Sequence, residues 1–377
     1  MMWMRLLDIC DFQGGSQPPK EEWSFAEQEG YIRMLQIRDF TQSEKVTPEY
    51  IKISNCIKTC TEDDVLIARY GASIGKVLTG IAGAYNVAIM RTIPDTDIIR
   101  KRFLYYYLKS SYFQYAILNV GSRAAQAGFN KTDLAKLEIT CPELSKQDKI
   151  VKILEKVESI IQKRKDQLNA LDYIIKARFV EMFGAVKYGS ERWGGKPFKD
   201  ITINLDSKRK PVKDADRKRM QGIYPYYGAT GIVDYINDYR QDGDFLLISE
   251  DGKALELRSK PIAFLASGKI WVNNHAHVQQ CTDECNMIYL MYHINFMDIS
   301  IWVTGIDQKK LNRANLDTIP IALPPIELQE QFAAFVHQVD KSKLLSLIKL
   351  LEQLITYLYN VFIIYRQDKG EEVEKYE

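Results

Sequence analysis

Apolar side chains recur at every third or fourth position through residues 147–183, and no glycine or proline interrupts this segment. The spacing predicts one long amphipathic helix with an apolar seam of the coiled-coil type. At about 1.5 Å per residue, the helix would extend roughly 55 Å. Gly184 follows directly and predicts its C-terminal end. Such a helix is too long for the interior of one compact domain, so we expect a spacer between two parts of the chain.

Shorter patterns precede the predicted helix. Residues 31–40, 64–69 and 81–93 predict strands, whereas the aromatic-rich residues 100–118 have helical spacing. A similar order returns downstream, with two strand patterns, an apolar helical segment and a second long helix from residue 329 to about residue 365. We therefore expect two globular domains of the α+β class, with mixed α and β structure.

The two halves share a spacing of 182 residues around the start of each long helix. The matched pairs are Gln126 and Gln308, Asn130 and Asn312, Leu134 and Leu316, Pro142 and Pro324, Gln147 and Gln329, and Val157 and Val339. This spacing indicates a duplicated unit of one domain plus one helix. Two unrelated domains with similar junctions remain an alternative. If the unit is duplicated, the simplest arrangement is an antiparallel coiled coil with a pseudo-twofold internal repeat, comparable to dimers that read two DNA half-sites.

The expected organisation has five parts. In chain order they are a first globular domain (1–145), a central spacer helix (146–184), a second globular domain (185–325), a C-terminal spacer helix (326–368) and an acidic tail (369–377).

The overall composition adds little to this picture, but the distribution of charged residues along the chain is informative. The net charge is only +2, but residues 206–219 hold seven Lys and Arg against three Asp, which suits either nucleic-acid binding or a solvated loop. No apolar run reaches the roughly 18 residues of a membrane helix. The N-terminus has no signal-peptide pattern, and six scattered cysteines suit a reducing compartment. We expect a cytoplasmic protein without a membrane partner.

Motifs for catalysis or cofactor binding are weak. Residues 71–76 (GASIGK) have three residues between the glycines, where a phosphate-binding loop has four, and Val77 replaces the Ser or Thr that holds magnesium. His275, His277, Cys281 and Cys285 match no standard zinc spacing. No methyltransferase signature and no nucleophile paired with a base are evident. We therefore predict no catalytic residue, no metal and no cofactor.

Several longer strings carry a resemblance that covers nearly the whole chain. They are residues 14–19 (GGSQPP), 31–33 (YIR), 209–212 (RKPV), 224–231 (YPYYGATG), 267–278 (SGKIWVNNHAHV) and 339–343 (VDKSK). With the two helix starts, these strings resemble the specificity subunits of type I restriction-modification systems.

The resemblance implies two target recognition domains separated by an antiparallel coiled coil. Such a subunit reads a two-part sequence in double-stranded DNA with an unread gap. It assembles with two methyltransferase subunits and with restriction and translocation subunits, and those partners hold the catalytic activity. Two other interpretations stay open: a coiled-coil adaptor that binds proteins without DNA specificity, and a relative of a fused restriction enzyme.

Candidates for DNA contact are loop residues that can neutralise phosphates or hydrogen-bond to base edges. In the first domain they are Gln17, Lys20, Arg38, Arg69, Gln126, Asn130 and Lys131. In the second they are Lys208, Arg209, Lys210, Lys213, Arg217, Tyr227, Thr230, Lys269, Asn273, Asn274, Gln308, Lys309, Lys310, Asn312 and Arg313. Each could instead stabilise its own loop, and Asn130 and Asn312 could be helix caps.

Overall fold

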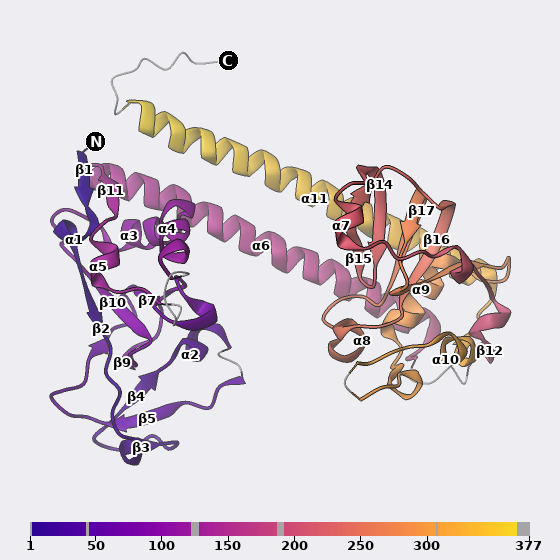
Figure 1. Ribbon diagram of the computed structural model, residues 1–377, viewed down its shortest axis with the longest axis horizontal. Helices are drawn as coiled ribbons and strands as arrows, with labels where there is room; N and C mark the ends of the chain where they lie inside the picture. The colour runs from indigo at the N-terminus through magenta and orange to yellow at the C-terminus, as the bar shows by residue number, and fades with distance from the viewer. Residues whose placement is uncertain (1, 43–44, 122–127, 187–191, 307, 368–377) are drawn as a thin grey trace. The chain divides into compact units, whose positions relative to one another are not determined.

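The computed structural model divides the chain into two compact units (Figure 1). The first unit joins the chain up to Gln162 with the end of the last helix from Leu350, and the second unit is Lys163–Lys349. The structure describes residues 2–42, 45–121, 128–186, 192–306 and 308–367.

The first unit contains three small sheets. A two-stranded sheet pairs β1 (Met2–Arg5) with β11 (Glu138–Cys141). A four-stranded sheet has the order β2 (Cys10–Gly14), β10 (Ile89–Pro94), β7 (Leu66–Ala68) and β8 (Val77–Leu78). A five-stranded sheet has the order β3 (Trp23–Ser24), β5 (Glu49–Lys52), β4 (Tyr31–Leu35), β9 (Gly83–Tyr85) and β6 (Thr59–Cys60).

Helices pack against the sheets of the first unit. They are α1 (Leu6–Ile9), α2 (Ile37–Thr41), α3 (Lys101–Lys109), α4 (Ser111–Gly121) and α5 (Lys131–Leu134), with short 3₁₀ turns η1 (Lys20–Glu22) and η3 (Gly71–Ser73). The largest core of this unit combines Phe12 and Ile67 of the sheet with Leu104 of α3 and Phe113 of α4, all buried. Burial of such side chains contributes about 1.5–3 kcal/mol each, so this core holds helices and sheet together.

Three sequence predictions in the first domain need correction. The predicted strand 31–40 ends at Leu35, because Gln36 and Asp39 form a capping box that begins α2. The predicted strand 81–93 is two strands, β9 and β10, which belong to different sheets. The predicted helix 100–118 is interrupted at Ser110, whose hydroxyl donates to the Tyr107 carbonyl at 2.6 Å.

The second unit is organised around one six-stranded sheet. Its order is β13 (Thr202–Asn204), β18 (Ala276–Cys281), β16 (Gln241–Ser249), β17 (Ala263–Val272), β14 (Gln221–Gly228) and β15 (Gly231–Ile236), all antiparallel except β14 with β17. β12 (Gly195–Pro197) pairs with β19 (Pro320–Ala322). The shorter helices are α7 (Asp214–Arg217), α8 (Lys253–Leu257), α9 (Met287–Phe296) and α10 (Arg313–Thr318), with η4 (Phe198–Asp200), η5 (Asp206–Lys208) and η6 (Ser300–Trp302).

Both faces of strand β16 are buried. Leu246 and Ile248 pack with α9 and α10 in one core, whereas Phe245 and Leu247 point to a second core on the opposite face. This alternation follows from the two-residue period of a strand. It explains why residues 245–248 form a continuous apolar run in the sequence.

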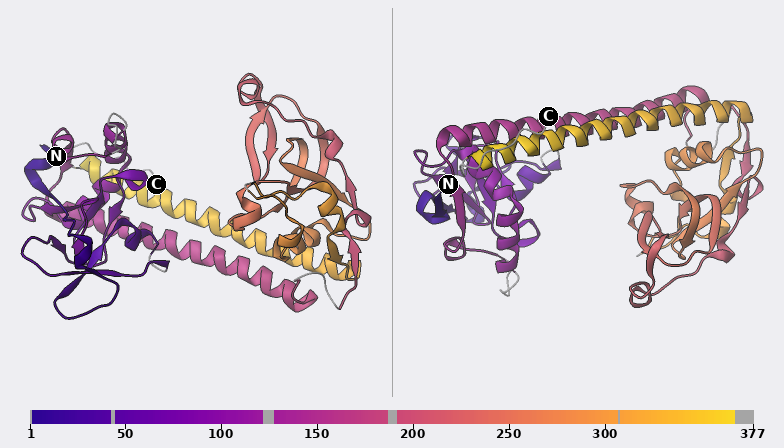
Figure 2. Two further views of the ribbon diagram at one scale, coloured as in Figure 1. Left: turned by 60° about the horizontal axis from the view of Figure 1, so that its bottom comes forward. Right: turned by 90° about the horizontal axis from the view of Figure 1, so that it is seen from above.

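The two long helices are α6 (Leu144–Phe183) and α11 (Ile326–Gln367). α6 ends as predicted at Gly184, which has a φ of +86° and donates its N–H to the Val180 carbonyl at 2.8 Å. Within the second unit the helices run antiparallel, as the pair Lys343 and Asp172, 2.6 Å apart, indicates (Figure 2). The predicted fold class, two α+β domains with an antiparallel helix pair, is therefore confirmed.

The matched glutamines at the two helix starts make equivalent hydrogen bonds. Gln147 is fully buried, donates to the Ile98 and Pro142 carbonyls at 2.8 and 2.7 Å, and accepts from the Arg100 amide at 2.8 Å. Gln329 donates to the Glu284 carbonyl at 3.1 Å and the Pro324 carbonyl at 2.7 Å, and accepts from the Asn286 amide at 2.9 Å. Each glutamine thus fastens the start of a long helix to the turn before a shorter helix of its own domain.

Replacement of Gln329 by Leu is expected to destabilise the protein by about 2–4 kcal/mol, because three backbone groups, two partly buried and one buried, lose their partner. Urea unfolding of the full chain measures this change. Replacement of the neighbouring, exposed Glu330 by Ala is the control and is expected to change stability by less than about 0.5 kcal/mol. Equal midpoints for the two variants would contradict the role of Gln329.

Candidate nucleic-acid interface

The candidates of the first domain divide into paired and unpaired side chains. Arg38 is 2.5 Å from Glu49, and Lys131 pairs with Asp11, whose carboxyl pKa it lowers through a hydrogen bond. Arg69 lies half-buried, with its guanidinium 4.5 Å from the centre of the Tyr70 ring. Asn130 caps α5 by accepting the Asp133 amide. Gln17 and Lys20 are exposed, and Gln126 lies outside the described residues.

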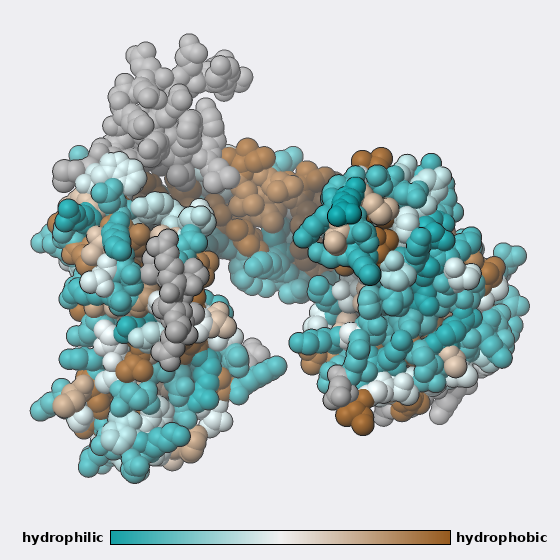
Figure 3. Space-filling model, viewed as in Figure 1, coloured by the Kyte–Doolittle hydropathy of each residue, from teal (hydrophilic) through white to brown (hydrophobic). Residues whose placement is uncertain are grey.

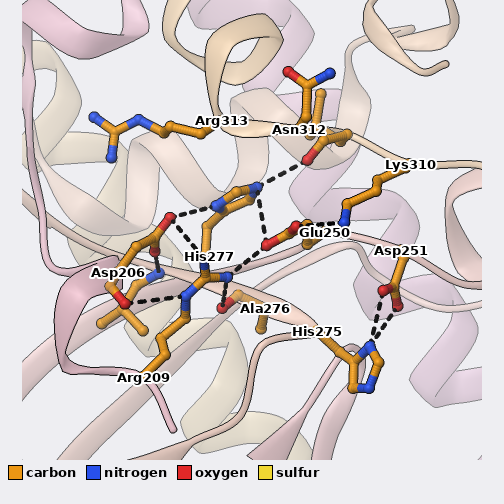
Figure 4. Close-up of polar contacts among 12 residues, drawn as sticks. Asp206, Arg209, Glu250, Asp251, His275, Ala276, His277, Lys310, Asn312 and Arg313 are labelled. Atoms are coloured by element: carbon orange, nitrogen blue, oxygen red, sulfur yellow. Dashed lines mark hydrogen bonds and ion pairs between the residues drawn. The ribbon is translucent and has the colours of Figure 1, made fainter. Parts of the chain in front are cut away.

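In the second domain, the basic run 208–210 alternates between inward and outward side chains. Lys208 and Lys210 are exposed. The Arg209 side chain is only 16% exposed and donates to Glu250 at 2.5 Å and to the Ala276 carbonyl at 3.1 Å (Figure 4). Arg209 is therefore held by a buried ion pair, and its two neighbours are the ones free to meet phosphate groups.

Arg209 belongs to a buried network with Asp206, Glu250, His277 and Lys310 (Figure 4). Burial raises the pKa of Asp206, but the hydrogen bond and charge of His277, the Val278 amide and Arg209 together lower it below the ordinary value. Burial likewise raises the pKa of Glu250, whereas hydrogen bonds from Arg209 and Lys310 lower it. Both carboxyl groups have a lower pKa in the folded state than in the unfolded chain. Their ionised forms therefore stabilise the fold at neutral pH, and this contribution is lost as the pH falls through the folded-state pKa values.

Other candidates near this run also have structural partners. Arg217 pairs with Asp214 and, at 3.2 Å, with Asp234. Tyr227 is buried and stacks on Phe264 with 6.1 Å between ring centres.

Asn273 and its neighbours differ in exposure. Asn273 is buried and accepts the His275 amide at 2.8 Å. Lys213, Thr230 and Asn274 are exposed. Of these residues, only the exposed three can reach an extended ligand without rearrangement.

The loop before α10 carries the remaining candidates. Asn312 caps α10 through the Asn315 amide at 2.9 Å, and Arg313 pairs with Asp317 at 2.5 Å. Lys310 is half-exposed and lies 3.0 Å from Glu250. Gln308 is exposed and Lys309 is half-buried. The two asparagines of the repeat are thus both helix caps, the alternative that their sequence position left open.

Lys269, a predicted contact, belongs to a cluster of cations on aromatic rings whose other members the sequence did not indicate. Lys269 lies 4.7 Å from the centre of the Tyr239 ring, which raises the pKa of its amine. Arg240 lies 5.5 Å from the Trp271 ring and donates to the Lys208 carbonyl at 3.0 Å. These contacts join β17 to the segment before β16, so no local spacing in the sequence could reveal them. They add Arg240 and Tyr239 to the surface beside the basic run.

The segments weighed for other chemistry have structural roles. In residues 71–76, Gly75 donates its N–H to the Ala68 carbonyl at 2.8 Å and accepts from Gln114 at 2.7 Å. His275 is 2.8 Å from Asp251. Among the described residues, no group of three or more His, Cys, Asp or Glu side chains is arranged to hold a metal ion. Within the same residues, no helix combines the length and the apolar character needed to cross a bilayer.

The chain thus contains two α+β domains, each of which leads into one of the two long helices. The family model of the type I restriction modification DNA specificity domain matches residues 1–170 and 191–356. The chain belongs to this family, and the resemblance inferred from its sequence is confirmed. The two matched segments correspond to the two halves of the internal repeat.

Individual relatives agree with this family. A type I restriction enzyme specificity subunit of Haemophilus influenzae is 38% identical over 144 residues, which are 38% of this chain and 36% of that protein. The match therefore spans about a third of that relative's length. The EcoprrI specificity subunit of Escherichia coli is 22% identical over 367 residues, 90% of this chain and 87% of the relative.

Solved structures support the fold. The S subunit of the type I restriction-modification system of M. genitalium has a TM-score of 0.53 at 14% identity, with 96% of this chain and 95% of that chain covered. A chain from a study of complex assembly and conformational transition of the type I system also has a TM-score of 0.53, at 13% identity and 97% coverage of both chains.

Proposed function

We propose that this chain is the DNA-recognition subunit of a type I restriction-modification complex and that it reads two short DNA elements around an unread gap. The observation that carries the proposal is the duplication: two copies of a DNA specificity domain lie in one chain. Residues 1–145 and 185–325 would be the target recognition domains, and residues 146–184 and 326–368 the spacer helices. The predicted acidic tail, 369–377, lies outside the described residues.

The exposed face of α11 supports docking of partner subunits. Apolar side chains spaced as on one helical stripe are exposed there, and the hydrophobic surface is visible in Figure 3. They are Leu344, Leu347, Ile348, Leu351 and Ile355. Exposed stripes of this kind mark protein interfaces more often than solvated surfaces. We propose that two methyltransferase subunits cover the coiled coil and that restriction subunits join them for cleavage.

In this proposal the chain itself catalyses nothing, requires no cofactor and acts in the cytoplasm. Its role would be to hold each methyltransferase over its DNA element. Methylation of DNA by the purified chain with S-adenosylmethionine alone would contradict that role.

A second candidate is a coiled-coil adaptor that binds proteins without DNA specificity, since the same apolar stripe would serve it. A salt titration of binding to a labelled DNA duplex separates the two. A DNA-reading chain loses affinity steeply as salt increases, because each Lys or Arg that binds a phosphate releases counterions from the DNA. Indifference to DNA at low salt would favour the adaptor.

Replacement of both Lys208 and Lys210 by Ala is expected to weaken DNA binding for every sequence and to lower the slope of log affinity against log salt by about two, roughly one for each lost phosphate contact. Lys199 and Lys260 are exposed and lie outside the basic run, so their replacement by Ala provides the control. An unchanged slope in the Lys208 and Lys210 variant would exclude these side chains as phosphate contacts.

A further inference from the structure

His277 lies on β18 and is fully buried between two loops of the second domain (Figure 4). Its Nδ1 is 2.7 Å from Asp206 Oδ2, and its Nε2 is 2.8 Å from the Leu311 carbonyl. Asp206 begins the loop of Lys208 and Lys210. Leu311 directly follows Lys309 and Lys310. One imidazole ring therefore joins the two loops that carry most of the basic candidates of this domain.

Both partners of the ring are acceptors. The Leu311 carbonyl has no hydrogen to donate. Asp206 also accepts the Val278 amide at 2.8 Å, and Arg209 Nη2 lies 3.3 Å from its Oδ2. A carboxylate with three donors around it is stabilised in the ionised form. Since neither partner can donate, the two hydrogen bonds require a hydrogen on each ring nitrogen, and this geometry requires the imidazolium form of His277.

The charges around the ring come from both loops and from β16. Glu250, which follows β16, has its Oε2 3.9 Å from His277 Nε2. That carboxylate accepts from Arg209 of the first loop and from Lys310 of the second. The titratable and charged groups that face the ring are therefore Asp206, Arg209, Glu250 and Lys310. Two carboxylates and three cations form one cluster that depends on both loops.

The second buried histidine of this domain shows that burial alone does not produce the charge. His293 on α9 accepts the Ala322 amide at 3.2 Å, so its Nε2 carries no hydrogen. Burial lowers its pKa to about 3. A neutral His293 and a charged His277 differ because only His277 faces a carboxylate.

We propose that His277 is a positioning residue whose imidazolium holds residues 206–213 and 309–313 together as one DNA-contacting surface. The inference rests on the proposed DNA recognition. Replacement of His277 removes both hydrogen bonds, and one loop is released from the other. DNA affinity therefore falls in a variant without the ring, and the number of phosphate contacts falls with it.

The charge can be observed directly in the full chain. The protein has four histidines, so selective ¹⁵N labelling of histidine gives four side-chain systems. At neutral pH, the signals of His277 are expected to show both nitrogens protonated, whereas those of His293 show a neutral ring. The signals that disappear in the His277→Gln variant assign the residue. A neutral tautomer of His277 would overturn the proposal without any need for a DNA substrate.

The positioning role is tested by titrating a mixed-sequence DNA duplex with the full chain at several salt concentrations and one pH. The His277→Gln and Asp206→Asn variants are expected to bind roughly tenfold more weakly than the wild-type chain, with a slope of log affinity against log salt lower by about one or two. The His275→Gln variant, which changes an exposed histidine two residues away, should keep the wild-type affinity and slope.

The outcomes distinguish a failure of the proposed DNA recognition from a failure of the positioning role of His277. If the wild-type chain does not bind the duplex at low salt, the proposed function fails and the DNA role of His277 fails with it. If it binds and the His277→Gln and Asp206→Asn variants keep its affinity and salt slope, only the positioning role is overturned. Thermal unfolding confirms that the variants are folded. Should either variant unfold, the other variant and the ¹⁵N spectra decide the question.

Discussion

Replacement of Arg209 by Met is expected to destabilise the second unit by about 3 kcal/mol. The guanidinium is the shared partner of Glu250 and Asp206, whose side chains are each only 12% exposed. Removal of one member of a buried ion pair typically costs about 3–5 kcal/mol because the other charge stays buried. Lys310 and His277 remain beside the two carboxylates, so the lower end of that range is expected. Denaturant unfolding of the full chain measures the loss.

Lys208 and Lys210 provide matched controls for this change, because they are the immediate neighbours of Arg209 and are exposed. Their replacement by Met is expected to change stability by less than about 0.5 kcal/mol. A double-mutant cycle with Glu250→Gln adds a second criterion. Loss of Arg209 should cost less in the Glu250→Gln background, because the buried charge is then absent. Equal stability of the Arg209 and Lys208 variants would show that the ion pair contributes nothing.

The three basic residues illustrate what a sequence can reveal about a binding surface. Their clustering predicted a basic loop at residues 206–219, and the structure has exposed lysines there. The direction of each side chain was not predictable, because the partner that turns Arg209 inward, Glu250, lies 41 residues away in the sequence. A local pattern cannot identify a partner supplied by another strand.

The long helices were predictable for the opposite reason. Their apolar period is local, extends over many turns, and is not interrupted by glycine or proline before Gly184. The repeat was also visible, because Gln147 and Gln329 must be glutamine to donate to two carbonyls and accept from one amide. The repeat alone did not show whether a matched residue binds DNA or stabilises the fold. Asn130 and Asn312 recur at matching positions because each caps the start of a short helix.

Deletion of seven residues from each long helix, at facing positions, is expected to shorten the gap between the two DNA elements and to leave the sequence of each element unchanged. Each deletion removes two helical turns, roughly 10 Å, and a register based on a seven-residue repeat keeps the apolar seam continuous. Since base pairs along DNA are about 3.4 Å apart, the gap should shorten by about three base pairs. The measurement is the map of methylated positions in DNA from cells that express the variant with its partner subunits.

The antiparallel contacts explain why both helices must be shortened together. Within the second unit Lys343 faces Asp172, and the Ser346 hydroxyl accepts from Arg164 at 3.4 Å. Within the first unit, Lys156 lies 5.5 Å from the centre of the Tyr357 ring. Deletion from one helix alone would shift these pairs out of register, so that variant is expected to lose stability and methylation together. If the doubly shortened variant is folded and methylates with the wild-type gap, the helices do not set the distance between the two elements.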